Sequence, residues 1–512
     1  MPADKAFPSV VHMLIDAARN APGNEAVVCL DERLNYRAYL NCVLGFAEEL
    51  TQIGVRGERV ALVLGNSLDI CIAMFGSHLA GAQVVPMNPM YTENELRPML
   101  LDAEVKVIIY DKCNQTCVEK LADELKIPHR IFIDGKSGRR LIEWKDDNSR
   151  SVPERLPKTE ELAMLQFTGG TTGRAKGANL SHGAIAGNIH QTEVMQQPEM
   201  DCERNLCVMP LFHCYAWSVC LYNMCNCRGC MVIIPRYQPD EVLSAFSQEA
   251  ITIFAGSPTL FTGLMNYEGF QNTDFSTLKL SNSGSAPLAA ELLEKWESTT
   301  GTPIYEGYGQ TEASPVISFN PKDKPTKSGS VGVAIPETVI EIVSLDGEDR
   351  VLPANEKGEI RLRGPQVMSG YRNLPEETAQ TLRDGWLYTG DVGYLDEDSY
   401  LFITARKKEM LLVSGFNVFP REIEEVLFLH SGIKEAAVVG KSDAYRGELP
   451  VAFIVENGTV NLDAESLTDY CEKNLARYKV PDEFRKLEAL PKTAVGKVDK
   501  VALSALAETP SE

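Results

Sequence analysis

The sequence has little positive charge for its size and lacks several features that would assign it to a functional class. Its 50 lysine and arginine residues face 71 aspartate and glutamate residues, which gives a net charge of −21 at pH 7. This balance excludes nonspecific binding along a nucleic-acid backbone. No apolar run reaches the roughly 18 residues of a membrane span, and the N-terminus lacks the basic and apolar regions of a signal peptide. We therefore expect a cytoplasmic protein with no nucleic-acid partner and no integral membrane segment.

A second pair of metal-binding cysteines is also lacking. Five of the thirteen cysteines fall close together: Cys214, Cys220, Cys225, Cys227 and Cys230. Cys227 and Cys230 have the C-x-x-C spacing of metal ligands, but His213 is the one histidine nearby. Reduced thiols packed in a core are the favoured interpretation, and a metal site is the alternative.

The most informative stretch is rich in glycine and threonine. The apolar run from Ala163 to Phe167 ends in Thr168, Gly169, Gly170, Thr171, Thr172 and Gly173, followed by Arg174 and Lys176. Glycine backbones, threonine hydroxyls and these cations can together bind phosphate. Gly177 stands where a Walker A loop requires Ser or Thr, so this is a different phosphate cradle. A helix can begin at Ser181. Taken alone, the stretch is equally compatible with an ordinary flexible loop.

The pattern of short apolar strands and amphipathic helices predicts an α/β fold. Strands such as Arg59 to Leu64 alternate with helices, which indicates layered parallel sheets with helices outside. From about Gly332 to Leu401 short alternating strands indicate a small antiparallel barrel or sheet. The last hundred residues can fold as a separate α+β unit. We expect a large N-terminal domain over residues 1–407 and a small mobile C-terminal domain over residues 408–512.

Four further motifs follow the cradle in a fixed order. They are Tyr305-Glu-Gly-Tyr-Gly-Gln-Thr-Glu312, Trp386-Leu-Tyr-Thr-Gly-Asp391, Arg406-Lys-Lys-Glu409 with Ser414-Gly-Phe-Asn-Val-Phe-Pro420, and Pro491-Lys-Thr-Ala-Val-Gly-Lys497. With the cradle, this set resembles the adenylate-forming superfamily of acyl-CoA synthetases, luciferases and peptide-synthetase adenylation domains. The resemblance covers nearly the whole chain and is strongest to fatty-acyl-CoA ligases.

The resemblance implies a role for each matching residue. Nucleotide binding would involve Thr168, Gly169, Gly170, Thr171, Thr172, Gly173, Lys176, Gly284, Ser285, Ala286, Glu306, Gly307, Tyr308, Asp391 and Arg406. Thr311 would contact the α-phosphate, Glu312 would bind Mg²⁺, and Lys497 would bridge the substrate carboxylate and the α-phosphate. His213 and Trp217 would line the acyl pocket, with Trp217 as its gate, although core packing is the alternative for such aromatics. Lys408 would be the hinge, and Ser414, Gly415 and Phe416 would line the CoA tunnel.

The resemblance further implies an acyl-CoA ligase that uses ATP, CoA and Mg²⁺ and acts alone or as a homodimer. Medium- or long-chain fatty acids are the expected substrates, because the segment from Val208 to Val219 is apolar. Short, branched, sulfur-containing and aryl acids stay open. Two alternative functions stay open. One is an adenylation protein that loads a separate acyl carrier. The other is a noncatalytic nucleotide-binding or scaffolding relative, which the intact Glu312 and Lys497 disfavour.

Overall fold

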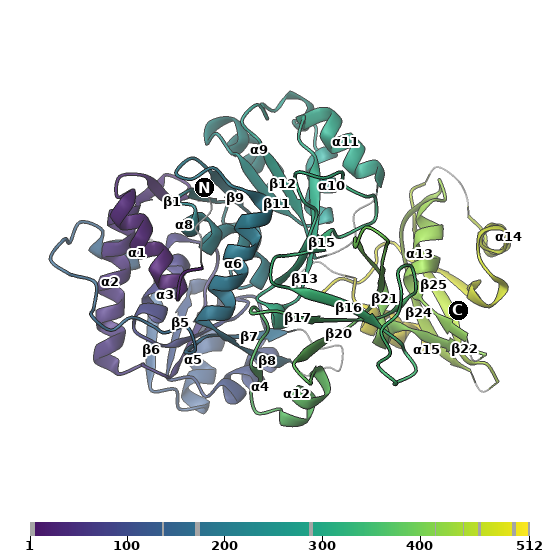
Figure 1. Ribbon diagram of the computed structural model, residues 1–512, viewed down its shortest axis with the longest axis horizontal. Coiled ribbons are helices and arrows are strands. Elements are labelled where there is room, and N and C mark those ends of the chain that lie inside the picture. The colour runs from purple at the N-terminus through teal and green to yellow at the C-terminus, as the bar shows by residue number, and fades with distance from the viewer. Residues whose placement is uncertain are drawn as a thin grey trace. The chain divides into compact units, whose positions relative to one another are not determined.

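The chain forms two compact units, whose helices and strands are coloured along the chain in Figure 1. The computed structural model describes residues 6–135, 138–168, 175–285, 290–414, 416–443, 445–458, 462–493 and 498–509. Unit 1 comprises Met1–Ile340 and Leu362–Leu387, and unit 2 comprises Glu341–Arg361 and Tyr388–Glu512. Over the described ranges, no helix combines the length and apolar character of a membrane span. The predicted division after residue 407 stays a prediction.

The first sheet of unit 1 is parallel over five strands and antiparallel at one edge. In spatial order its strands are β18 (Gly370–Tyr371), β8 (Lys176–Ser181), β7 (Leu162–Thr168), β4 (Gln83–Pro86), β3 (Arg59–Val63), β5 (Val107–Asp111) and β6 (His129–Ile133). Strands β7 to β6 run parallel, and β8 pairs antiparallel with both β7 and β18. The intervening helices are α3 (Leu68–Leu79), α4 (Glu93–Ala103) and α5 (Gln115–Glu124). The predicted alternation of strand and helix is confirmed here.

The second sheet of unit 1 is also parallel in its centre. Its order is β15 (Val333–Ala334), β14 (Val316–Phe319), β13 (Ile304–Gly309), β12 (Leu280–Ser283), β11 (Ile253–Gly256), β9 (Arg204–Cys207), β10 (Cys230–Ile233), β1 (Glu25–Cys29) and β2 (Glu32–Asn35). The strands from β13 to β1 run parallel, whereas β2, β14 and β15 pair antiparallel. Three helices follow its central strands: α9 (Pro239–Gln248), α10 (Pro258–Met265) and α11 (Ala290–Thr300).

One hydrophobic core joins the two sheets of unit 1. Its helices are α1 (Val10–Asn20), α2 (Tyr36–Ile53), α3, α6 (His182–Gln196), α7 (Cys214–Ala216), the π-helix η3 (Trp217–Tyr222) and α8 (Asn223–Asn226). Every residue of α3 is buried, including Asp69 and His78, because the largely apolar helix packs within this core. Leu62 and Val84 of the first sheet share the core with Val27 and Ile253 of the second. The two sheets therefore form one packed body.

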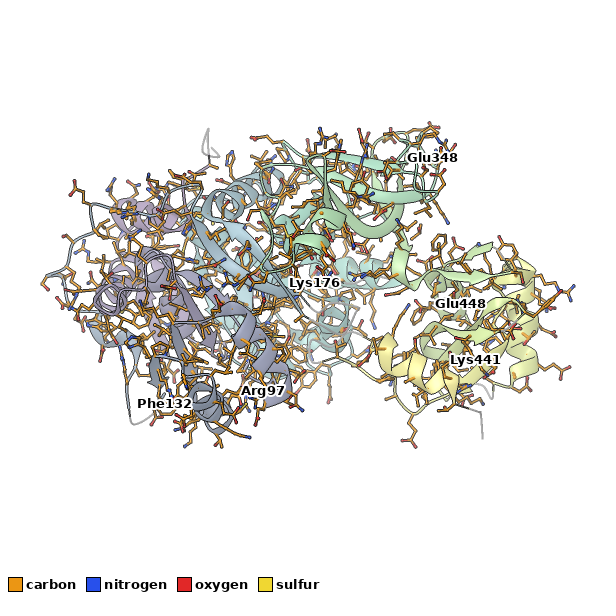
Figure 2. The ribbon with its side chains drawn as sticks, turned by 90° about the horizontal axis from the view of Figure 1, so that it is seen from below. Arg97, Phe132, Lys176, Glu348, Lys441 and Glu448 are labelled. Atoms are coloured by element: carbon orange, nitrogen blue, oxygen red, sulfur yellow. The ribbon has the colours of Figure 1, made fainter. Side chains whose placement is uncertain are left out.

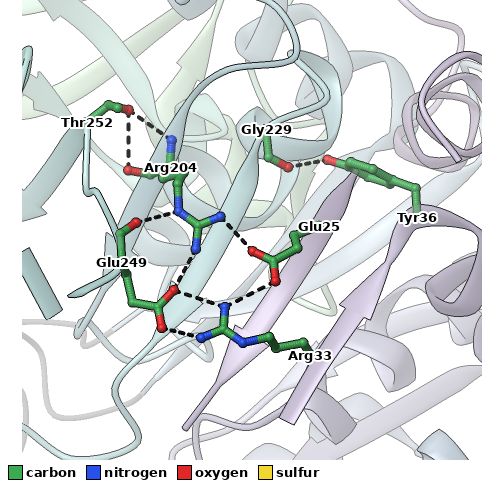
Figure 3. A network of polar contacts seen from close by, with 7 residues as sticks. All are labelled: Glu25, Arg33, Tyr36, Arg204, Gly229, Glu249 and Thr252. Carbon is green, nitrogen blue, oxygen red and sulfur yellow. Dashed lines mark hydrogen bonds and ion pairs between the residues drawn. The ribbon is translucent and has the colours of Figure 1, made fainter. Parts of the chain in front are cut away.

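An ion-pair network ties the edge of the second sheet to the end of α9 (Figure 3). The Glu25 carboxylate on β1 accepts from Arg204 at 2.7 Å and from Arg33 at 3.1 Å. The same two guanidinium groups also bind Glu249. The Arg204 and Arg33 donors are thus matched by two carboxylates, and the network joins segments more than 170 positions apart in the chain.

Unit 2 contains most of an antiparallel sheet and a separate α+β layer. The sheet consists of β16 (Val339–Val343), β17 (Gly358–Arg363), β20 (Trp386–Leu395), β19 (Leu382–Arg383) and β21 (Leu401–Arg406); the division between the units falls within β16, β17 and β20, and β19 belongs to unit 1. The layer contains β22 (Leu411–Val413), β23 (Phe416–Val418), β24 (Ile433–Asp443), β25 (Gly447–Glu456) and β26 (Glu483–Lys486), with α13 (Pro420–Phe428), α14 (Ala464–Asn474) and α15 (Lys500–Glu508). Figure 2 labels Lys441 on β24 and Glu448 on β25, the long antiparallel pair of this layer. Antiparallel pairing is confirmed for β19, β20 and β21.

Candidate active site

The hairpin of β7 and β8 flanks the predicted phosphate cradle. Thr168 ends β7 and pairs with Lys176, the first residue of β8, which is labelled in Figure 2. Residues 169–174 between them, which hold the remaining cradle positions, lie outside the described residues. Ser181 ends β8 and caps α6, because its Oγ accepts a hydrogen bond from Ala184 N at 3.1 Å. The helix predicted to begin at Ser181 is therefore confirmed.

A tight turn between β13 and β14 carries Thr311 and Glu312. β13 ends at Gly309, and the short 3-10 helix η5 (Thr311–Ala313) follows. A Cβ atom on Gly309 would lie 2.2 Å from the carbonyl oxygen of Pro315, and one on Gly307 would lie 2.9 Å from the Phe319 ring. The Pro315 backbone therefore requires glycine at 309, and the Phe319 ring crowds position 307. The turn places Thr311 and Glu312 beyond the carboxyl end of a parallel strand, where open α/β sheets bind ligands.

Thr311 and Glu312 each contact a side chain that the motifs do not single out. Tyr371 Oη donates to Glu312 Oε1 at 2.7 Å, and the Tyr371 ring centroid lies 5.2 Å from Lys176 Nζ. Thr311 Oγ1 lies 3.5 Å from Cys214 Sγ. The structure therefore brings together three predicted residues, Lys176, Thr311 and Glu312. Tyr371 contacts two of them, Lys176 and Glu312, and no period or spacing in the sequence distinguishes it.

The predicted adenine residues lie at the ends of two neighbouring strands. β12 and β13 are parallel and pair Ser283 with Glu306, so their carboxyl ends meet at one sheet edge. Gly284 follows β12, and a Cβ atom there would lie 3.3 Å from the Tyr215 ring. Four of the six predicted residues, Ser285, Glu306, Gly307 and Tyr308, lie beside Gly284 along these two strands, and Ala286 lies outside the described residues. Their contact with adenine stays a prediction.

The predicted acyl-pocket residues His213 and Trp217 follow β9. His213 caps α7, with Nδ1 accepting from Tyr215 N at 3.2 Å. Trp217 is fully buried at the start of η3, and its Nε1 donates to Gln166 Oε1 at 2.9 Å. Gln166 in turn donates to the carbonyl oxygen of Phe212 at 3.2 Å. These bonds hold Trp217 in one orientation against β7, and its role as a gate stays a prediction.

The clustered cysteines are buried thiols. Among the described residues, no group of three or more His, Cys, Asp or Glu side chains is arranged to hold a metal ion. Burial raises the pKa of both Cys227 and Cys230 to about 12, as expected for thiols enclosed in a core. Burial of all five thiols supports the interpretation that they pack in the core: Cys214, Cys220, Cys225, Cys227 and Cys230.

Asp391 and Arg406 pair across two strands of unit 2. They are register partners on β20 and β21, and Arg406 Nε lies 3.2 Å from Asp391 Oδ1. The Asp391 side chain is 6% exposed, whereas that of Arg406 is 52% exposed. The strand pair therefore fixes a carboxylate whose partner can move into solvent. Their contact with ribose stays a prediction.

The predicted hinge residue Lys408 lies between two anchored neighbours. Lys407 Nζ donates to Glu359 on β17 at 2.6 Å, and Glu409 accepts from Lys500 on α15 at 2.8 Å. Lys408 itself is exposed in the short 3-10 helix η6 (Lys407–Glu409). The chain is thus held to a strand on one side of Lys408 and to a helix on the other.

The remaining predicted residues are in part outside the described structure. Ser414 has φ +52°, and its N–H donates to the carbonyl oxygen of Arg446 at 2.7 Å. Phe416 begins β23. Gly415 and Lys497 lie outside the described residues. The CoA-binding and catalytic roles predicted for these positions stay predictions.

Comparison with known proteins agrees with this arrangement. The family model for AMP-binding enzymes matches residues 14–372, and that for the AMP-binding enzyme C-terminal domain matches residues 422–497. A long-chain-fatty-acid–CoA ligase of Bacillus subtilis is 36% identical over 95% of this chain and 92% of its own length, and one of Yersinia pestis is 37% identical over 96% and 93%. The ATP-bound crystal structure of MatB from Rhodopseudomonas palustris superimposes with a TM-score of 0.89 at 27% identity, covering 97% of this chain and 98% of that one. The chain belongs to the AMP-binding enzyme family, which confirms the adenylate-forming resemblance of its motifs.

Proposed function

We propose that the protein is an ATP-dependent acyl-CoA ligase that converts a carboxylate, ATP and CoA into acyl-CoA, AMP and pyrophosphate. The observation that carries this proposal is the contact of Tyr371 with both Lys176 and Glu312 in unit 1, beside Thr311, which precedes Glu312 in the chain. A cation, a hydroxyl and a carboxylate together suit a reaction at phosphorus in which charge is stabilised by positioned groups. Such a reaction needs no protein nucleophile.

In the first half-reaction the substrate carboxylate attacks the α-phosphate of ATP and pyrophosphate leaves. Thr168 and Lys176 would bind the departing phosphates with the glycine-rich loop, and the Thr311 hydroxyl would donate to the α-phosphate. Asp391 would accept the ribose hydroxyls. Lys497 would neutralise the substrate carboxylate and the α-phosphate as they approach each other, since both carry negative charge.

Glu312 fits a site for Mg²⁺. It supplies a carboxylate oxygen, and Mg²⁺ in nucleotide enzymes is commonly held by one or two carboxylates together with substrate phosphates. When bound, Mg²⁺ would neutralise phosphate charge.

In the second half-reaction the CoA thiol attacks the acyl adenylate and AMP leaves. The small domain would turn about Lys408 to remove Lys497 and admit CoA past Ser414 and Gly415. All thirteen cysteines are free thiols, which favours the reducing cytoplasm as the site of this reaction.

We further propose a medium- or long-chain fatty acid as the substrate. The segment that carries His213 and Trp217 lies within the hydrophobic core of unit 1, and the two relatives described above are long-chain-fatty-acid ligases by name. A short, sulfur-containing or aryl acid is the alternative within the same reaction. Loading of a separate carrier protein is the alternative acceptor.

The test is pyrophosphate release with ATP and Mg²⁺ over acids of increasing length and several aryl acids, each with and without CoA. We expect an optimum among long-chain acids, with continuous turnover only when CoA is present. An optimum among short or aryl acids would refute the substrate class but leave the ligase. Turnover that requires an added carrier protein, never CoA, would refute the ligase itself.

A further inference from the structure

Tyr371 links two parts of the candidate site that lie far apart in the sequence. Its hydroxyl donates to Glu312 Oε1 at 2.7 Å, and the centroid of its ring lies 5.2 Å from Lys176 Nζ. Lys176 begins β8 after the phosphate cradle, and Glu312 lies in the turn after β13. One side chain therefore contacts both the residue expected to bind phosphate and the residue expected to bind Mg²⁺.

The backbone around Tyr371 is fixed on two sides. Tyr371 pairs with Ala178 of β8, and its N–H donates to Thr378 Oγ1 at 2.9 Å. Gly370 has φ +136°, a conformation that L side chains rarely adopt, and a Cβ atom there would lie 2.8 Å from Thr378. These contacts fix the backbone of β18, which carries the Tyr371 ring.

Glu312 is fixed in the same way, from its backbone as well as its side chain. The N–H of Met368 donates to the carbonyl oxygen of Glu312 at 2.8 Å, three residues before Tyr371. The segment from Met368 to Tyr371 thus binds Glu312 at two points. A carboxylate held at one oxygen has fewer orientations available, so less freedom is lost when the other oxygen binds a cation.

The Tyr371 hydroxyl donates its proton to the Glu312 carboxylate at 2.7 Å. A neutral phenol that donates to a carboxylate makes a charge-assisted hydrogen bond, which is stronger and more directional than a neutral one. The face of the same ring attracts an ammonium group, which keeps Lys176 Nζ beside the site.

We propose that Tyr371 is a positioning residue that orients Glu312 toward Mg²⁺ through its hydroxyl and holds Lys176 near the ATP phosphates through its ring. This inference rests on the proposed function, in which Glu312 and Lys176 bind Mg²⁺-ATP. The Tyr371 side chain contributes in two separate ways. The hydroxyl governs the response to Mg²⁺, and the ring governs the affinity for the nucleotide itself.

The test is calorimetric binding of ATP to the full chain, without acid or CoA, over a range of Mg²⁺ concentrations and in EDTA. Tyr371→Phe keeps the ring and removes the hydroxyl. We expect it to raise the Mg²⁺ concentration that half-maximally strengthens ATP binding by about tenfold, the effect of losing one charge-assisted hydrogen bond. Binding in EDTA should be unchanged. Tyr371→Leu should also weaken ATP binding in EDTA, because Lys176 loses the aromatic face.

Tyr110→Phe is the matched control. Tyr110 on β5 also donates to a glutamate, Glu119 Oε1 at 3.2 Å, but none of the site residues contacts this pair in the described structure. It should bind ATP and respond to Mg²⁺ as the wild type does, and thermal melting should show that all three variants are folded.

The proposal is overturned if Tyr371→Phe responds to Mg²⁺ as the wild type does, or if the wild type binds ATP equally well in EDTA. Because no acid is present, an error in the proposed substrate leaves this result standing. Failure of the wild type to bind ATP at all would refute the proposed function together with the role of Tyr371.

Discussion

Replacing Trp217 by phenylalanine tests whether this buried indole shapes the acyl pocket or only fills the core. The change removes the N–H that reaches Gln166 Oε1 at 2.9 Å, and Gln166 is itself only 5% exposed. An acceptor left unsatisfied in a buried site costs about 1–3 kcal/mol. The smaller ring adds a cavity cost of about 1–2 kcal/mol. We therefore expect the free energy of unfolding of unit 1 to fall by about 2–5 kcal/mol, measured from urea transitions.

The same variant should change substrate preference if Trp217 bounds the acyl pocket. Space released at the end of a pocket favours longer chains, and we expect the ratio of kcat/KM for long over medium acids to rise by about tenfold. The KM for ATP should stay the same. Steady-state kinetics over the acid panel measures both quantities.

Trp296→Phe is the control for this experiment. Trp296 is also fully buried, and its Nε1 donates to Ser281 Oγ at 3.1 Å, but it packs in a separate core between α11 and the second sheet. Trp296→Phe should lower the free energy of unfolding by a similar amount without changing the preference among acids. If Trp217→Phe and Trp296→Phe give the same flat profile across acids, Trp217 serves packing alone and the gate is refuted.

Three other perturbations follow from the same structure. Lys497→Ala should slow acid-dependent pyrophosphate release by about 10²- to 10³-fold while sparing thioester formation from a supplied acyl adenylate; equal loss of both half-reactions would contradict the domain rotation. Asp391→Asn should raise the KM for ATP by about tenfold with little change in the KM for the acid, because a charged acceptor for ribose is lost; an unchanged KM for ATP would remove Asp391 from the nucleotide site. Burial lowers the pKa of His182 to about 3 and that of His78 well below its ordinary value, so the unfolded chain binds more protons below about pH 6.5. The contribution of these histidines to the free energy of unfolding should therefore be fully present above this pH and fall by about 1.4 kcal/mol per pH unit for each histidine as the pH decreases. In His182→Asn the urea midpoint should depend less steeply on pH between about pH 6 and 4. A pH dependence as steep as that of the wild type would contradict this assignment.

The sequence predicted the parts of the fold that repeat a local pattern. Apolar strands such as β3 and β5 alternate with helices, and their parallel pairing follows from that alternation. Ser181 as a helix cap is a short-range signal, and α6 begins where that signal places it. The order of the five motifs indicated the family, because five motifs in a fixed order are far more specific than any one of them.

Other features depend on contacts between distant segments. Tyr371 acquires its partners only when β18 pairs with β8, 190 or so positions away in the chain, and no local pattern marks that pairing. Leu141 lies in a polar segment of the chain but is buried, and Asp69 accepts from its N–H at 2.6 Å and from Arg140 at 2.7 Å. The π-helix η3 likewise has no signal in a sequence that reads as an ordinary helix.

The crowding at Gly307 and Gly309 bears on how this family is recognised in genomes. A side chain at Gly309 would meet the Pro315 backbone and one at Gly307 would meet the Phe319 ring, whether or not a nucleotide ever binds. A relative that had lost all catalysis would still need these glycines to fold, so their presence in a motif search reports architecture and not activity. The side chains at positions 311, 312 and 371 are not fixed by crowding of this kind. Degenerate copies of the enzyme should therefore first differ at those three positions, inside a motif whose glycines are intact.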